Sequence, residues 1–324
     1  MDKKVAIIGS GISGLTAMHY LNKKGFSPTI FEKSSNIGGI IQTKTIDGFT
    51  IETGPNTILL SDKRTEQLFK ELNLSIEDAS PESKKRYVVK KGKYEALPVS
   101  LYSFIKTPLF SFSTKFKIIT EFLRRNKPSV NEESISQFIN RRFGKEVLDY
   151  AINPFIAGTY AGDPDMLSIE HSFPKLYEIE KKYGSIIGGF FKDRNNKNYY
   201  KIKRRTISMS GGISKLTEKL AIGLSDSIFI QSQINDISKT ENGYTLKFMQ
   251  KNKEKSFNCD NIICTIPTYS LKNITVHGKP VKDFQDLSKI DYPPVISVSL
   301  GFNSNDIAHD LLGFGALVPK CENM

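Results

Sequence analysis

The sequence predicts an α/β fold in which a domain of alternating strands and helices is interrupted by a mostly helical insertion. Three observations lead to this expectation. An apolar strand, a glycine-rich turn, a helix and a second strand open the chain. The middle of the chain is basic and aromatic, with apolar residues at helical spacing, and strand patterns return after residue 227. This order indicates one interrupted domain with insertions.

The first strand, residues 5–8, runs directly into a glycine-rich turn at residues 9–14. Gly9 permits the tight turn, Gly11 lets the backbone approach a phosphate group, and Gly14 lets the following helix pack closely on the sheet. The free N–H groups and the positive dipole end of that helix then face an anion. Glycine turns are common, so this motif is weak evidence when it stands alone.

An acidic residue, Glu32, ends the second strand. It follows Gly9 by twenty-three positions, the spacing at which a carboxylate accepts hydrogen bonds from a ribose. The strand, turn, helix and acid together predict a dinucleotide-binding site. A second glycine pair, Gly38 and Gly39, comes soon after the acid. A nicotinamide enzyme has no need of it, whereas extended FAD requires a second surface of close backbone approach, so we expect a flavoprotein.

Composition excludes several other classes. The 324 residues carry a formal charge of +12, and the three cysteines lack metal-ligand spacing, so we expect buried, reduced thiols in a cytosolic setting and no metal site. The uncharged stretch at residues 292–305 holds two prolines and is too short to cross a bilayer. The apolar run after residue 4 enters the nucleotide turn, which favours a strand over a signal peptide.

Positive charge is concentrated between residues 84 and 128, where twelve Lys or Arg side chains accompany two acids and eight aromatic residues. Three interpretations compete for this stretch. It can lie on an anionic membrane surface, bind nucleic acid, or form an ordinary helix with solvated lysines. The nucleic-acid interpretation is the weakest, because no known nucleic-acid module accompanies the charge.

The remaining elements follow from periodicity and turn signals. We expect helices over residues 63–72, 132–150 and 209–224. We expect a strand at 228–230, a hairpin of strands 234–237 and 244–248, and a buried parallel strand at 261–265. The expected domain parts are a first nucleotide-binding part, a basic helical insertion, a second nucleotide-binding part and an incomplete substrate domain, at residues 1–85, 86–205, 206–275 and 276–324.

Several longer stretches carry a resemblance to a known family. The segments 32–43, 47–49 and 54–55 resemble the amine-oxidase superfamily of flavoproteins. The segments 86–98, 153–164 and 184–189 resemble its oxygen-dependent porphyrinogen-oxidase branch, and the likeness extends along essentially the whole chain. The resemblance implies a Rossmann-like FAD-binding domain, a helical membrane-associated insertion and a mixed-sheet substrate domain.

The resemblance also implies which residues contact ligands. Arg86 would pair with a substrate propionate, and Phe314 would line the tetrapyrrole pocket; a solvated arginine and a plain core aromatic are the alternatives. Ile234 would offer backbone hydrogen bonds to the adenine. No catalytic dyad and no metal ligands are expected. The other residues expected to hold FAD are Gly9, Ser10, Gly11, Ile12, Ser13, Gly14, Glu32, Lys33, Gly39, Ile40, Gly54, Pro55, Asn56 and Thr57.

The activity that the resemblance implies is oxidation of protoporphyrinogen IX to protoporphyrin IX in haem synthesis, with molecular oxygen as acceptor. Coproporphyrinogen III is the alternative substrate. An amine oxidase and a flavin-free binding protein of the same fold are the alternative functions. We expect no nucleic-acid partner and a cytoplasmic protein that is peripheral on the cytoplasmic membrane, and homodimer formation is left open.

The family pattern continues beyond Met324, so the resemblance implies a fragment or a truncated product with poor activity. Residues 313–319 are expected to form a strand that lacks its partners.

Overall fold

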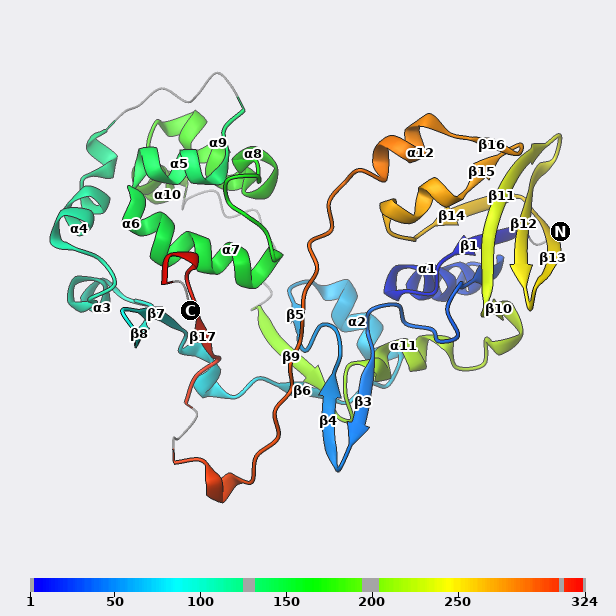
Figure 1. Cartoon of the computed structure of the whole chain (residues 1–324), viewed down its shortest axis with the longest axis horizontal. Helices are drawn as coiled ribbons and strands as arrows, with labels where there is room; N and C mark the ends of the chain where they lie inside the picture. The colour runs from blue at the N-terminus through cyan, green and yellow to red at the C-terminus, as the bar shows by residue number, and fades with distance from the viewer. Residues whose placement is uncertain (1–2, 125–131, 194–203, 309–311, 323–324) are drawn as a thin grey trace. The chain divides into compact units, whose positions relative to one another are not determined.

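The computed structural model describes residues 3–124, 132–193, 204–308 and 312–322. The chain divides into two units, which are described separately (Figure 1). Unit 1 comprises residues 1–79, 202–292 and 296–301, and unit 2 comprises residues 80–201, 293–295 and 302–324. Strands and helices mix in both units, so the predicted α/β class is confirmed.

A four-stranded parallel sheet forms the centre of unit 1, in the order β10-β2-β1-β14. Its first strand is buried over four of its five residues, as expected for a parallel sheet covered on both faces. The predicted parallel strand at 261–265 is confirmed as β14. The bounds are β1 Lys4–Ile8, β2 Ser27–Phe31, β10 Ile228–Phe229 and β14 Asn261–Cys264.

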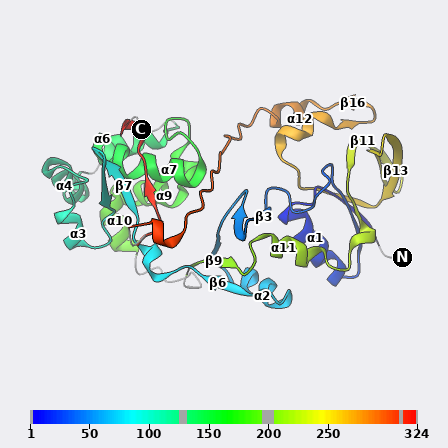
Figure 2. The ribbon, with the colours of Figure 1, turned by 60° about the horizontal axis from the view of Figure 1, so that its bottom comes forward.

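Helix α1 (Ile12–Lys23) packs on this sheet and lies beside α11 (Ser214–Ala221), as Figures 1 and 2 both show. The buried residues Leu15 and Met18 lie on the sheet-facing side of α1. Helix α2 (Lys63–Glu71) confirms the expected helix at 63–72, and Asp62 caps it by accepting from two backbone N–H groups.

A five-stranded sheet, β13-β12-β11-β15-β16, covers one side of the parallel sheet. The predicted hairpin is confirmed, with antiparallel pairing from Ser232↔Gln250 to Thr240↔Gly243. Phe31 on β2 contacts three aromatic rings from β10, β12 and β13, which joins the two sheets through one apolar cluster. The bounds are β11 Ser232–Thr240, β12 Gly243–Gln250, β13 Lys253–Cys259, β15 Thr275–Val276 and β16 Lys279–Pro280.

Smaller elements complete unit 1. A three-stranded sheet has the order β5-β9-β6, and β3 and β4 form a separate antiparallel hairpin. Their bounds are β3 Thr43–Ile46, β4 Phe49–Glu52, β5 Ile58–Leu60, β6 Ile76–Asp78 and β9 Arg205–Met209. The short helical segments are η4 Ser225–Ser227, η5 Thr268–Asn273 and α12 Lys282–Leu287.

Unit 2 is mostly helical around its own apolar core, which includes Val88, Phe138 and Ile156. Among the described residues of unit 2, three strands form a sheet in the order β17-β7-β8, with bounds Ala316–Leu317, Tyr87–Lys90 and Lys93–Ala96. The α-helices are α3 Leu101–Lys106, α4 Phe112–Ile119, α5 Ile135–Arg142, α6 Lys145–Val147, α7 Asn153–Tyr160, α8 Ile169–Ser172, α9 Pro174–Tyr183 and α10 Ile186–Asp193. The other helical segments are η1 Pro81–Lys84, η2 Glu121–Leu123, η3 Leu148–Ile152, η6 Ser304–Asp306 and η7 Lys320–Glu322.

Four sequence predictions are wrong in detail. The helix expected at 209–224 is shorter, since Met209 ends β9, Gly211 and Gly212 have positive φ, and α11 covers only Ser214–Ala221. The single helix expected at 132–150 is divided, because Gly144 adopts a positive φ of 95° that an α-helix cannot contain. The strand at 313–319 does have a partner, since β17 pairs in parallel with β7. Of the three cysteines only Cys259 is buried, whereas Cys264 and Cys321 are exposed.

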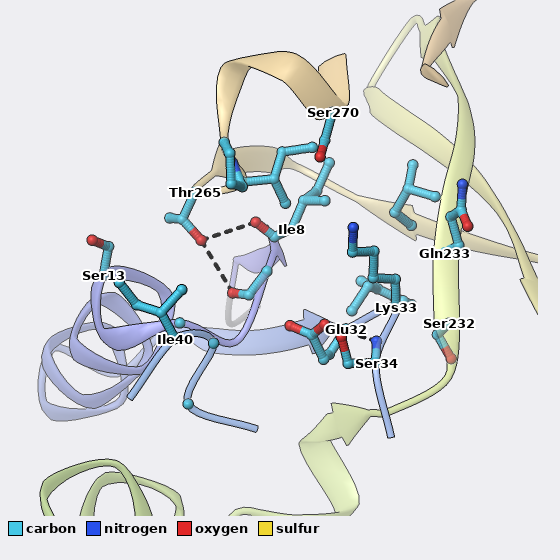
Figure 3. Close-up of a pocket in the computed structure, with 18 of the residues that line it drawn as sticks. Ile8, Ser13, Glu32, Lys33, Ser34, Ile40, Ser232, Gln233, Thr265 and Ser270 are labelled. Atoms are coloured by element: carbon cyan, nitrogen blue, oxygen red, sulfur yellow. Dashed lines mark hydrogen bonds between the residues drawn. The ribbon is translucent and has the colours of Figure 1, made fainter. Parts of the chain in front are cut away.

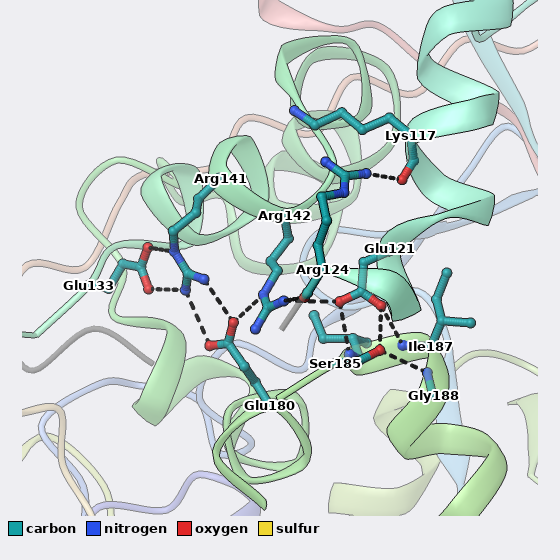
Figure 4. Close-up of polar contacts among 11 residues, drawn as sticks. Lys117, Glu121, Arg124, Glu133, Arg141, Arg142, Glu180, Ser185, Ile187 and Gly188 are labelled. Carbon is teal, nitrogen blue, oxygen red and sulfur yellow. Dashed lines mark hydrogen bonds and ion pairs between the residues drawn. The ribbon is translucent and has the colours of Figure 1, made fainter. Parts of the chain in front are cut away.

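A buried ion-pair network holds the helices of unit 2 together (Figure 4). Glu121 on η2 accepts hydrogen bonds from the Ser185 hydroxyl at 2.7 Å and from the first two N–H groups of α10, both at 3.0 Å. Arg142 on α5 pairs with Glu121 at 3.3 Å and also with Glu180 on α9. Glu121 is fully buried, so this network replaces the water that its charge would otherwise require.

Candidate functional site

The glycine-rich turn lies between the end of β1 and the start of α1. Gly9 has a φ of +101°, and a side chain there would approach Thr265 Oγ1 to 3.0 Å. The Thr265 hydroxyl donates to the carbonyl oxygens of Ile8 at 2.9 Å and Gly9 at 3.1 Å, which ties the turn to the end of β14 (Figure 3). Gly14 is packed so closely that a Cβ atom would lie 2.0 Å from the Gly9 carbonyl oxygen.

The N-terminus of α1 is suited to bind an anion. Gly11 occupies the N-cap position, no side chain caps the helix, and its first turn contains no acidic residue. A Cβ atom at Gly11 would meet no protein atom within 4 Å, so the space beside it is open. The first N–H groups and the helix dipole therefore favour a phosphate group at this point.

Glu32 directly follows β2, and hydrogen bonds from the glycine turn hold its carboxylate in place. Its Oε2 atom accepts hydrogen bonds from the Ser10 N–H and the Ser10 hydroxyl, both at 2.8 Å, and its Oε1 atom accepts from the Ser34 N–H at 2.8 Å. Burial raises the pKa of the Glu32 carboxyl, but these hydrogen bonds outweigh burial and the pKa lies below its ordinary value. Glu32 is therefore ionised at neutral pH.

The second glycine pair lies against the first turn. The Gly38 N–H donates to the Ser10 carbonyl oxygen at 2.9 Å, and Gly38 and Gly39 both have positive φ, at 95° and 62°. A Cβ atom at Gly39 would lie 3.2 Å from the Gly11 Cα atom. The two glycine segments thus approach each other at the backbone, which places Ile40 at the rim of the same cavity.

These elements surround a cavity of about 480 Å³ in unit 1, shown in Figure 3. One wall comes from the end of β1, the start of α1 and the loop after β2, and the opposite wall comes from β11, the end of β14 and η5. The volume falls within the range of small-molecule and cofactor sites. Among the expected FAD-binding residues, the ones that line it are Gly9, Gly11, Ile12, Ser13, Glu32, Lys33, Gly39, Ile40 and Ile234.

The other expected residues lie near the cavity without lining it. Ser10 holds Glu32, and Gly14 packs against the turn. Residues 54–57 are not part of the cavity wall, although a Cβ atom at Gly54 would meet the Ile40 carbonyl oxygen at 2.0 Å. The segment at residues 54–57 therefore packs against the loop that carries Ile40 and supports it.

Sequence reasoning missed the wall formed by η5 and the end of β14. Thr265, Ser270 and Asn273 all line the cavity. The strand at 261–265 and the following proline were recognised, but no residue there was assigned to the site. The useful signal was that a parallel strand adjacent to β1 must end at the same edge of the sheet as the glycine turn.

Unit 2 contains the two residues expected at the substrate. The Arg86 guanidinium lies over the Phe314 ring, with Cζ 5.1 Å from the ring centroid. The Phe314 N–H donates to the Lys85 carbonyl oxygen at 2.8 Å, and this backbone bond fixes the pairing. Arg86 is exposed and forms no ion pair with any described acidic residue. A cation stacked on an aromatic ring and lacking an acid is ready to bind a carboxylate.

Within the described part of the chain, no group of three or more His, Cys, Asp or Glu side chains is placed to hold a metal ion. No described helix is long and apolar enough to span a bilayer.

Comparison with known proteins identifies the family. The model of the flavin-containing amine oxidoreductases matches residues 12–323. The chain belongs to this family. Protoporphyrinogen oxidase 2 of Arabidopsis thaliana is 34% identical over 99% of the chain and 68% of its own length. Coproporphyrinogen III oxidase of Bacillus subtilis is 27% identical over 98% of the chain and 70% of its own length. The resemblance inferred from the sequence is confirmed at the level of the family.

Solved structures share the fold at lower sequence identity. A triple mutant of putrescine oxidase superposes with a TM-score of 0.64 at 20% identity, over 89% of this chain and 63% of the other. Reduced UDP-galactopyranose mutase gives a TM-score of 0.61 at 17% identity, over 89% and 59% of the two chains. The chain therefore spans about 60% of these structures and about two thirds of the curated relatives.

The cavity suits the cofactor of this flavin-containing family, and that cofactor is FAD. The uncapped start of α1 and the two approaching glycine segments would hold the pyrophosphate, and the ionised Glu32 would accept from the adenosine ribose. Bound FAD supplies two-electron redox chemistry, while the protein supplies orientation and electrostatics. The predicted cofactor and the coarser prediction of a flavoprotein oxidoreductase are confirmed.

Proposed function

We propose that this flavoprotein oxidoreductase acts on protoporphyrinogen IX and forms protoporphyrin IX, with molecular oxygen as the electron acceptor. The relatives named protoporphyrinogen oxidase support the substrate class, at 33–34% identity over nearly the whole chain. The observation in the structure that supports it is the Arg86–Phe314 pair, a cation without an acid beside an exposed aromatic ring.

The overall reaction removes six hydrogen atoms from the porphyrinogen in three two-electron steps. Each pair of electrons and protons reduces one oxygen molecule to hydrogen peroxide, so three oxygen molecules are consumed for each porphyrin formed. No described residue is required as a nucleophile. The roles of this chain are to orient the tetrapyrrole, to exclude bulk water and to bind the propionates.

Arg86 would bind a propionate of the substrate through two parallel N–H···O hydrogen bonds. The Phe314 ring orients the guanidinium before binding, which reduces the entropy cost of ordering a long side chain. Replacing Arg86 by Leu should raise KM by about 10-fold or more, the loss expected for a charge-assisted hydrogen bond, and should leave flavin absorbance unchanged. An unchanged KM would contradict this role.

Coproporphyrinogen III is the second candidate substrate, because two relatives carry that name at 27% and 29% identity. Protoporphyrinogen IX carries two vinyl groups at the positions where coproporphyrinogen III carries two additional propionates. Anaerobic reduction of the bound flavin by each porphyrinogen, followed by re-oxidation with oxygen, compares them directly. Faster reduction by coproporphyrinogen III, or no reduction by either one, would overturn the proposed substrate.

We also propose that the protein lies on the cytoplasmic membrane as a peripheral protein, bound through α3, α4 and η2. The apolar residues Phe116, Ile119, Phe122 and Leu123 of α4 and η2 are between 49% and 70% exposed. Phe112 is 89% exposed, and the Lys115 ammonium lies 5.8 Å from the centroid of its ring. Exposed aromatic rings beside lysines are suited to the interface of an anionic bilayer.

Co-sedimentation with vesicles tests the membrane proposal. Binding should rise with the content of anionic lipid and fall for the double variant Phe112→Ser, Phe116→Ser. Lys63→Ser, a change of a basic residue in unit 1, serves as the control. Binding that is independent of anionic lipid, or unaltered in the double variant, would contradict the proposal.

A further inference from the structure

The wall of the cavity formed by β11 and η5 contains two amide side chains, Gln233 and Asn273. Both are exposed, and neither forms a hydrogen bond with another described residue. Each immediately precedes a buried isoleucine that also lines the cavity, Ile234 at 4% exposure and Ile274 at 3%. The cavity is thus bordered by two dipeptides of the same kind, each with an amide and an apolar side chain.

The two dipeptides lie on neighbouring backbone segments that run in parallel. Asp236 of β11 pairs with Thr275 of β15, and the Thr275 hydroxyl donates to the Asn235 carbonyl oxygen at 3.1 Å. Asn273 lies two residues before Thr275, and Gln233 lies three residues before Asp236. The sheet register therefore brings both amides to one end of the cavity.

Contacts at each side hold this arrangement in place. The Ser232 N–H, next to Gln233, donates to the Glu32 carbonyl oxygen at 2.7 Å, so β11 is tied directly to the residue that binds the ribose. On the other side, the Tyr269 ring of η5 packs edge-on against Tyr292 with centroids 5.1 Å apart. The Tyr292 hydroxyl also accepts from the Thr268 N–H at 3.4 Å, which fixes the start of η5.

The chemistry of the two dipeptides matches an adenine ring. Adenine has flat apolar faces and edges that present an acceptor ring nitrogen beside the donor N6 amino group. An amide side chain offers an N–H donor beside a carbonyl acceptor, which is the pattern that binds this edge. The buried isoleucines would contact the ring face, and the ring would lie next to the ribose that Glu32 holds.

We propose that Gln233 and Asn273 are the side chains that select adenine, and hence the dinucleotide FAD over flavins that lack the base. The inference rests on the FAD site and does not depend on which porphyrinogen is the substrate.

Binding of nucleotide fragments tests this without any measurement of turnover. The probes are ADP, GDP and FMN, titrated by calorimetry against the protein freed of flavin. Gln233→Met and Asn273→Leu should each weaken ADP binding by about 3- to 10-fold, the loss expected for one net hydrogen bond, and leave FMN binding unchanged. Gln285→Met on α12, an exposed amide outside the cavity, is the matched control and should change neither.

A second variant separates base recognition from a general loss of structure. Asn273→Asp keeps the shape but offers only acceptors, so it should weaken ADP and strengthen GDP, whose N1–H and N2 amino groups are donors. A reversed preference between the two bases supports the proposal. Equal losses of ADP and GDP, or ADP affinities within 2-fold of the unaltered protein for both single amide variants, would overturn it.

Discussion

Glu32 in unit 1 and Glu121 in unit 2 are two buried carboxylates with nearly the same hydrogen-bond donors. Each accepts from one serine hydroxyl and from two backbone N–H groups, at 2.7–3.0 Å. They differ in what occupies the rest of their surroundings. Glu121 also pairs with Arg142 and is fully buried, whereas Glu32 forms no ion pair with any described base and lines an open cavity.

This difference separates a structural carboxylate from one that binds a ligand. Glu121 lies on η2, and its partners come from α5 and the start of α10. Its charge therefore stabilises the packing of these helices. No described basic side chain pairs with the Glu32 carboxylate. Its oxygen atoms still have lone pairs facing the cavity, where they can accept hydrogen bonds from a ribose. Comparable local chemistry therefore serves stability in one unit and binding in the other.

The largest expected effect is the loss of Glu121. Replacing Glu121 by Ala leaves a buried guanidinium short of one carboxylate and removes the cap of α10, so the free energy of unfolding of unit 2 should fall by about 3–5 kcal/mol. Hydrogen–deuterium exchange of peptides from α9 and α10 measures this. FAD affinity, measured separately, should stay within 2-fold. A loss of FAD binding without faster exchange would reverse the roles given to the two carboxylates.

Glu32→Gln should have its main effect on binding. The amide keeps the size of the side chain but removes the charge and places an NH₂ group near donors, so FAD affinity should fall by about 10- to 100-fold. Quenching of flavin fluorescence on titration gives the dissociation constant. Glu32→Asp, which keeps the charge on a shorter side chain, is the matched comparison and should lose less. Unchanged FAD occupancy in Glu32→Gln would refute the assignment of the cavity.

The dependence on pH follows from the lowered pKa of Glu32. A carboxyl whose folded pKa is below its ordinary value of 4.5 stabilises the folded state fully above that value, and the contribution is lost as pH falls through the folded pKa. FAD affinity should therefore be constant between about pH 5 and 8 as far as Glu32 is concerned, and should decline only below about pH 4.5. A decline centred near pH 6.5 would indicate a histidine in place of Glu32.

The smallest effect is expected for an exposed acid outside both sites. Glu218 on α11 accepts from Lys215 and Ser214 at 2.8 Å, and its side chain is 49% exposed. Glu218→Gln should change the free energy of unfolding by less than about 0.5–1 kcal/mol and should leave FAD affinity unaltered. Urea unfolding monitored by circular dichroism supplies the number. If Glu218→Gln lowered the free energy of unfolding more than Glu121→Ala does, burial of the carboxylate would not determine the size of the effect.

Local sequence patterns were sufficient for much of unit 1. The glycine turn, the ribose acid at Glu32, the hairpin of β11 and β12 and the parallel strand β14 are all encoded within short segments by periodicity and by glycine. In unit 2 the same reasoning was less successful. The expected long helix is divided at Gly144, and the strand near residue 316 finds its partner in β7, more than two hundred positions earlier.

The sequence by itself determined the nucleotide-binding start of the chain, because close backbone approach requires glycine and a ribose hydroxyl requires an acceptor at a fixed distance along the chain. Only the tertiary structure decided which acidic side chains remain available to bind a ligand and which are paired with basic side chains. Glu121 looks like an ordinary member of a basic segment until Arg142 and the start of α10 meet it. The tertiary structure also placed Asn273 and Ile234 on the wall of one cavity, since pairing between strands far apart in sequence depends on the fold and not on spacing.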